Sequence, residues 1–93
     1  MADFEVTEHP DSFRFELLRD GVVIGFADYS RAGNTVIVPH VETDAAHRGQ
    51  GFGALLVDGL LDILRDRGDK IVPVCSFAAE HIRASPQHQD LLA

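Results

Sequence analysis

A glycine-rich stretch, RGQGFG from Arg48 to Gly53, joins a β-branched apolar run to the longest amphipathic pattern in the chain. The run before it, TVIVPHVET, is mostly apolar and predicts a central strand that is buried on both faces. Apolar residues after it recur at helical spacing, and KIVPV follows as a further strand. A helix between two strands indicates that the strands are parallel and joined by a right-handed crossover. The chain is therefore limited to folds that contain a parallel strand pair.

The segment before this unit predicts antiparallel strands. Residues 4–8 alternate as a short strand, and Asp20-Gly21 is a strong hairpin signal between two further strands. AGNT makes a second turn, and Ser76 is a suitable N-cap for a helix that runs to about Ala84. The expected order is β-β-β-β-α-β-α. This order indicates an α+β fold that resembles an α/β sandwich, with a mixed, mostly antiparallel sheet.

The long helix should have two distinct faces. Its apolar face contains Phe52, Leu56, Leu60, Ile63 and Leu64. Asp58, Asp62 and Asp66 repeat at i, i+4, and because like charges at this spacing repel, we expect that stripe to face water. Gly68 is a plausible C-cap.

Composition narrows the class of protein. A chain of 93 residues with 45% apolar residues predicts one domain, residues 1–93, around one small core. A formal net charge of -7 argues against nucleic acid as a partner. The single cysteine, Cys75, excludes an internal disulfide and fits a reducing compartment. Neither a signal peptide nor a membrane span is visible, so we expect a cytoplasmic protein.

The glycines permit three interpretations. They form a tight strand-to-helix turn, a dinucleotide loop or a Walker loop, but the spacing G-x-G-x-G matches neither nucleotide motif. Without Cβ atoms the turn can bring several backbone N–H groups close to one ligand, and the helix dipole adds positive charge there. Such a cradle suits a diphosphate, whatever the net charge of the chain.

RGQGFG resembles the Arg/Gln-x-x-Gly-x-Gly/Ala motif of the GNAT N-acetyltransferase superfamily. The matched positions are Arg48, Gly51 and Gly53, and neighbouring backbone comes from Gly49, Gln50, Phe52 and Ala54. The wider frame PHVETDAAHRGQGFGALL…KIVPVCSF is similar to a minimal, single-domain branch of that superfamily, with His-x-Glu before the loop and Pro-x-Cys-x-Phe after the helix. The resemblance extends from about Thr35 to Asp90.

The resemblance implies a cofactor and its placement. It implies one minimal acyl-CoA-binding domain, residues 1–93, in which the loop and the helix N-terminus bind the pyrophosphate of acetyl-CoA. It also implies that the fourth and fifth strands splay apart, so that the pantetheine arm pairs with the strand around Pro39 to Val41. Pro39 independently predicts a bulge, or a place where the neighbouring strand has moved away.

Three side chains are candidates for the proton or acyl transfers. His40 and Glu42 are two residues apart and therefore share a face of a regular strand, where either can act as a general base. The alternative is that both are exposed at a strand end. Cys75 precedes a helix N-terminus, which favours a thiolate, so it is a candidate acyl carrier or proton donor. Its alternative role is that of a small buried hydrophobe.

The chain also departs from the larger GNAT enzymes. Many of these place a tyrosine after the fifth strand to protonate the thiolate, whereas the only tyrosine here is Tyr29. The helices and strands that normally enclose the acceptor site are missing. The acceptor site is therefore open or is completed by another chain. His47 precedes the phosphate loop and is a candidate to approach the ligand, and His9, His81 and His88 are most simply surface residues. A zinc deaminase pattern fails because PVCSFA has one cysteine, so we expect no metal.

The sequence therefore predicts an acetyl-CoA-dependent N-acetyltransferase. Its acceptor is an amine, either a small molecule or a protein lysine or N-terminus. The alternatives are a coenzyme A binding module with little or no catalysis, and a small interaction domain that binds no cofactor. The oligomeric state is left open between a monomer and a homodimer.

Overall fold

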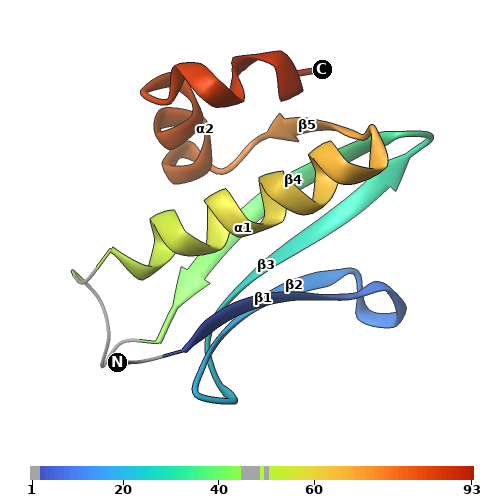
Figure 1. The fold of residues 1–93 in the computed structure, drawn as a ribbon. Helices are drawn as coiled ribbons and strands as arrows, with labels where there is room; N and C mark the ends of the chain where they lie inside the picture. The colour runs from blue at the N-terminus through green and yellow to red at the C-terminus, as the bar shows by residue number, and fades with distance from the viewer. Residues whose placement is uncertain (1–2, 45–48, 50) are drawn as a thin grey trace.

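The computed structural model of the chain describes residues 3–44, 49 and 51–93. The five strands are β1 (Phe4–His9), β2 (Arg14–Arg19), β3 (Val22–Ala32), β4 (Thr35–Thr43) and β5 (Lys70–Pro73). The helices are α1 (Phe52–Arg67) and α2 (Ser76–Arg83), with short 3-10 turns η1 (Pro10–Ser12) and η3 (Pro86–Leu91). The order of strands and helices confirms the predicted β-β-β-β-α-β-α arrangement (Figure 1).

The sheet has the strand order β1-β2-β3-β4-β5, in which only β4 and β5 are parallel. The β2–β3 hairpin turns at Asp20 (φ 49°) and Gly21 (φ 83°), as predicted, because a two-residue turn of this kind requires positive φ at both positions. The helix between β4 and β5 crosses the sheet and contacts all five strands (Figure 1). The predicted mixed, mostly antiparallel sheet with a parallel pair is confirmed.

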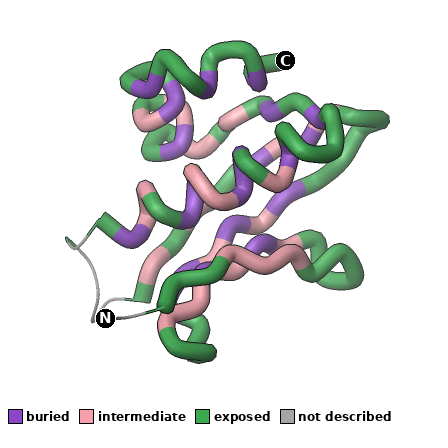
Figure 2. The backbone as a smooth tube through the Cα atoms, in the orientation of Figure 1, coloured by how far each residue is buried: buried purple, intermediate pink, exposed green. Residues whose placement is uncertain are grey.

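One face of the sheet is covered by helices. Buried residues on β2, β3, β4 and β5 lie under α1 (Figure 2), and their side chains form one core with the apolar face of the helix. On β4, Val36 and Val38 are fully buried, whereas Ile37 between them is half-buried and Pro39 is exposed. The prediction that β4 is buried on both faces is wrong, because the described helices pack on a single face.

Pro39 lies in a β-bulge. Asp28 pairs with His40 and Ser30 pairs with Ile37, so β4 has two residues opposite Tyr29. The pairing with β5 also ends here, at Val38, and the N–H groups of Val74 and Cys75 both donate to the Val38 carbonyl at 3.0 Å. Both predictions for this proline are therefore confirmed: the strand bulges, and its parallel neighbour leaves.

The helix ends follow the sequence signals with one correction. Gly68 (φ 75°) closes α1: its N–H donates to the Arg65 carbonyl, and the Asp69 N–H donates to the Leu64 carbonyl. This hydrogen-bond pattern is a Schellman motif, so the predicted C-cap is confirmed. At α2 the N-cap is Cys75 rather than Ser76, which is the first helical residue.

The acidic stripe of α1 does not lie wholly in water. The Asp58 carboxylate binds His81 Nε2 at 2.8 Å and His88 Nε2 at 3.0 Å, and it thereby links α1 to α2 and η3. His88 is only 6% exposed, so its prediction as a surface residue is wrong. Asp62 and Asp66 are exposed, as predicted. None of the helices in the described ranges is long and apolar enough to cross a membrane.

Candidate functional site

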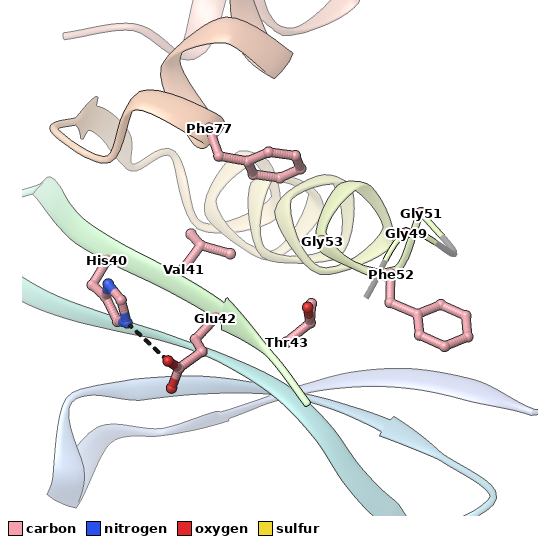
Figure 3. A pocket seen from close by; sticks show the side chains of 9 residues that line it. All are labelled: His40, Val41, Glu42, Thr43, Gly49, Gly51, Phe52, Gly53 and Phe77. Carbon is pink, nitrogen blue, oxygen red and sulfur yellow. Dashed lines mark ion pairs between the residues drawn. The ribbon is translucent and has the colours of Figure 1, made fainter. Parts of the chain in front are cut away.

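A pocket of about 490 Å³ opens between the end of β4 and the first turn of α1 (Figure 3). It is lined by His40, Val41, Glu42, Thr43, Gly49, Gly51, Phe52, Gly53 and Phe77. The β4 residues lie beyond the point where β5 leaves the sheet, and Phe77 comes from α2. The pocket therefore occupies the gap that the departing strand leaves, and the N-terminus of α1 faces into it.

The backbone favours glycine where this loop meets the helix. Gly51 is the N-cap of α1 with φ 79°, in the left-handed region that L side chains rarely adopt. The Leu55 N–H donates to the Gly51 carbonyl at 3.3 Å, and Gly51 has no side chain with which to cap the helix. Because the first N–H groups of a helix have no partner within the helix, this end of α1 offers donors and positive dipole charge to the pocket.

Gly53 allows close contact between α1 and α2. A Cβ at this position would lie 2.9 Å from two ring atoms of Phe77, closer than real Cβ contacts. The Phe77 ring also stacks on His81 with an interplanar angle of 5°, and His81 is held by Asp58. The pocket wall is therefore positioned by a chain of contacts that runs from α1 through His81 to Phe77.

Gly53→Ala should displace the Phe77 ring and weaken ligand binding in the pocket. Phe77 is 45% exposed, so its ring can move. We expect little net change in the free energy of unfolding, because the preference of a helix for alanine over glycine, about 1 kcal/mol, offsets the cost of displacing the ring. Calorimetric titration of acetyl-CoA into the wild type and Gly53→Ala measures the change in affinity. In a Phe77→Ala background the same alanine should have no effect on affinity, and an undiminished effect there would contradict the contact.

The bulge determines which side chains of β4 share a face. Val41 packs against the core, whereas His40 and Glu42 lie on the opposite face of the sheet, where Glu42 pairs with Phe26. His40 Nε2 lies 3.8 Å from Glu42 Oε1, and the two side chains are 54% and 45% exposed (Figure 3). The structure therefore brings together the two predicted bases, and both line the pocket.

The other predicted site residues are placed differently. Cys75 is half-buried against the core at the N-cap of α2, outside the set of described residues that line the pocket. Ala54 lies in the first turn of α1 but is likewise not among these lining residues. The predicted ligand residues Arg48 and Gln50, together with His47, lie outside the described residues.

Thr43 and Phe77 also line the pocket, although neither was among the predicted site residues. Thr43 is two residues after Val41, and because side chains alternate along a strand, the two residues share a face of β4. Phe77 is the aromatic residue of the PVCSF motif. The sequence therefore contained a pattern for each residue, but only the departure of β5 from the sheet shows that the two positions border a cavity. Within residues 3–44, 49 and 51–93 there is no group of three side chains that could hold a metal ion.

Tyr29 lies in the core and its hydroxyl is engaged. It is 7% exposed, and its OH donates to Glu8 Oε2 at 2.6 Å. Burial, followed by the hydrogen bond and charge of Glu8, raises the pKa of Tyr29 from 10.0 to about 12. Its side chain does not line the pocket, so it does not replace the missing tyrosine after β5.

We expect the phenol to titrate near pH 12 in the folded protein. A pKa raised in the folded state stabilises the fold fully below pH 10.0, and this contribution is lost as the pH rises through about 12. The chain has one tyrosine and no tryptophan, so ultraviolet absorbance reports Tyr29 alone.

Glu8→Gln should lower this midpoint yet leave it above 10.0, because burial is the larger cause. The same titration in denaturant provides the unfolded reference, at about 10. A midpoint near 10 in the folded wild type would contradict the buried, hydrogen-bonded phenol.

Comparisons with known proteins agree with this geometry. A family model described as GCN5-related N-acetyl-transferase matches residues 14–91. The NMR structure of a candidate GCN5-like N-acetyltransferase from Staphylococcus aureus aligns over 100% of this chain and 91% of its own, with 21% identity and a TM-score of 0.73. The crystal structure of the ribosomal-protein-S18-alanine N-acetyltransferase from Escherichia coli aligns over 92% of this chain and 77% of its own, with 16% identity and a TM-score of 0.68.

A further structure contains the cofactor. N-acetylglutamate synthase from Neisseria gonorrhoeae, solved with coenzyme A and N-acetyl-glutamate, aligns over 87% of this chain but only 21% of its own, with 14% identity and a TM-score of 0.60. At these identities the structural likeness establishes a shared fold. No curated protein was found to match the chain.

Proposed function

Because the chain belongs to the GCN5-related N-acetyltransferase family, we propose that it transfers an acetyl group from acetyl-CoA to an amine. The observation that carries this proposal is the pocket where β5 leaves β4 and the N-terminus of α1 faces the gap. Members of this family use acetyl-CoA, and the pocket has the backbone donors and apolar walls that such a ligand needs. The acceptor amine is not identified by family membership.

The described residues fit a diphosphate at one end of the pocket. Gly49 and Gly51 both have positive φ, and a Cβ at either position would meet no described atom within 4 Å, so the loop leaves open space beside its backbone. We assign the pyrophosphate to this loop and the first turn of α1, which includes Gly53 and Ala54. Arg48, Gln50 and Phe52 complete the assignment by their place in the motif.

Apolar surface lies next to this cradle. Val41 and Phe77 border the pocket, and β4 beyond Val38 pairs only with β3 among the described strands. We assign the pantetheine arm to this strand edge, because its backbone groups on the β5 side can pair with an amide-containing chain. When bound, acetyl-CoA supplies the activated acetyl thioester.

Three side chains are proposed for the reaction at the other end. His40 and Glu42 lie together and exposed, which suits removal of a proton from an incoming amine. Cys75 lies where β5 ends, with its N–H bound to the Val38 carbonyl, and is proposed as an acyl carrier or a proton donor to the departing thiolate.

One observation favours the second candidate, a coenzyme A binding module with little or no catalysis. The only tyrosine, Tyr29, is buried and bound to Glu8, and the side chains of His40 and Glu42, proposed to remove the amine proton, are 54% and 45% exposed. Such a module would still bind coenzyme A in the same pocket. Binding and turnover therefore have to be measured separately.

Calorimetric titration with acetyl-CoA and free coenzyme A, followed by intact mass on the same samples, tests the proposal. Micromolar binding corresponds to about -8 kcal/mol and is easily measured. An added acetyl mass that disappears in Cys75→Ala would support an acetyl-cysteine route, and amine acetylation that persists in Cys75→Ala but falls in Glu42→Gln would support direct transfer. Binding without turnover would favour the module, and no binding would overturn the function.

A further inference from the structure

A second pocket, of about 370 Å³, adjoins the first at the end of β4. It is lined by Val23, Ile24, Gly25, Phe26, Glu42, Thr43 and Asp44. Glu42 and Thr43 line both pockets, so the two cavities meet at these residues. A molecule in the second pocket would therefore lie beside a ligand in the first.

The second pocket combines an apolar wall with carboxylates. Phe26 and Glu42 are cross-strand partners and share the sheet face that the helices leave uncovered, and Val23 is 45% exposed beside Leu18. Glu42 and Asp44 supply the acidic groups, and no cationic side chain is among the described lining residues. An apolar wall with negative charge at one end matches an aliphatic chain that carries a positive charge.

Charged side chains also lie near the second pocket. The Arg14 guanidinium lies 4.0 Å above the Phe26 ring, and it is bound to the Asp28 carboxylate at 2.9 Å. His40 lies on the other side of Glu42 and carries charge only when protonated. With a formal net charge of -7, the chain as a whole also attracts cations.

We propose that this second pocket binds the acetyl acceptor, and that the acceptor is a primary aliphatic amine in its ammonium form on a short methylene chain. This inference rests on the proposed function, because it assigns a substrate class to the same site. The methylene chain lies along Val23 and Phe26, and the ammonium group lies at Glu42. The ammonium ion must lose a proton before its nitrogen can act as a nucleophile, and Glu42 is the carboxylate that both pockets share.

The test is a titration of the isotope-labelled protein followed by NMR, with and without coenzyme A. The probes are 1,5-diaminopentane and the lysine analogue Nα-acetyl-lysine methylamide, and the controls are the neutral 1,5-pentanediol and the anionic amine glutamate. We expect both amines to shift the amide signals of Val23, Phe26 and Glu42, and the controls to leave them unchanged. A stronger response to one amine identifies a free diamine or a lysine side chain as the source.

Two variants at neighbouring valines sharpen the test. Val23→Lys places a cation in the pocket and should weaken amine binding by about tenfold or more, corresponding to about 1.4 kcal/mol. Val22→Lys is the matched control, because Val22 is also exposed, at 63%, but does not line the pocket. Their spectra report whether each variant is folded.

The outcomes separate this inference from the proposed function. If neither amine shifts these amide signals, with or without coenzyme A, the acceptor assignment is overturned even if coenzyme A binds normally. The assignment is also overturned if Val23→Lys and Val22→Lys weaken amine binding equally. If the amines shift the signals of the second pocket but the protein does not bind coenzyme A, the second pocket is still an amine-binding site and the acetyltransferase proposal fails.

Discussion

Gly51→Glu is expected to weaken acetyl-CoA binding by about 100-fold or more, corresponding to about 2.7 kcal/mol. The substitution forces an L side chain into a backbone conformation at φ 79° and places a carboxylate in the open space beside the loop. The added negative charge opposes a diphosphate there, and it also occupies the positive end of the α1 dipole. Calorimetric titration of acetyl-CoA measures the loss directly.

Two controls separate strain from charge. Gly21→Glu has the same chemistry at φ 83° in the β2–β3 turn, away from the pocket, so it should cost stability and leave affinity unchanged. Gly51→Asn introduces a residue that tolerates the left-handed region and adds no charge, so its affinity for acetyl-CoA should lie between those of the wild type and Gly51→Glu. Equal affinities for Gly51→Glu and the wild type would contradict the assignment of the pyrophosphate to this loop.

Gly59→Ala is expected to destabilise the fold by about 2 kcal/mol, although the same change on an open helix surface stabilises by about 1 kcal/mol. A Cβ at this position would lie 2.7 Å from the Val6 Cβ and closer still to Val6 Cγ2. The α1 backbone therefore lies directly against β1, and any side chain at Gly59 pushes the edge strand away. Urea unfolding followed by circular dichroism measures the change in the free energy of unfolding.

A smaller partner should relieve this clash. In the double variant Gly59→Ala/Val6→Ala, the alanine at 59 should cost far less than it does beside Val6, with an interaction energy of about 1 kcal/mol or more. Strict additivity of the two single changes would show that close packing of α1 on β1 is not the cause. Neither residue lines the pocket to which acetyl-CoA is assigned by our proposal, so the affinity for acetyl-CoA should be unchanged.

The secondary structure was largely readable from local chemistry. Asp20-Gly21 and Gly68 mark positions that need positive φ, and both the hairpin and the C-cap form where they were expected. The helix between β4 and β5 predicts a parallel pair, because an antiparallel pair does not need so long a connection. Pro39 predicts a disrupted strand because it lacks the N–H that a ladder requires.

The candidate site was predicted less completely. The glycines at 49, 51 and 53 and the pair His40–Glu42 were selected by motif and period, and these residues line one pocket. The contribution of Phe77 depends on how α2 packs against α1, and the second pocket depends on an uncovered sheet face. Phe77 belongs to the PVCSF motif, but its place at the pocket and the uncovered sheet face both depend on contacts between elements that are far apart in the sequence.

The amino-acid sequence by itself determined the strand and helix order, the turns and the glycine-rich entry to α1, because steric limits on φ and missing N–H groups act within a few residues. Only the tertiary structure decided which side chains meet. Asp58 was expected in water, yet it binds His88, 30 residues away, because η3 folds back onto α1. The bulge at Pro39 likewise shifts the alternation of β4 by one residue, which turns Val41 toward the core and His40 and Glu42 toward the open face of the sheet.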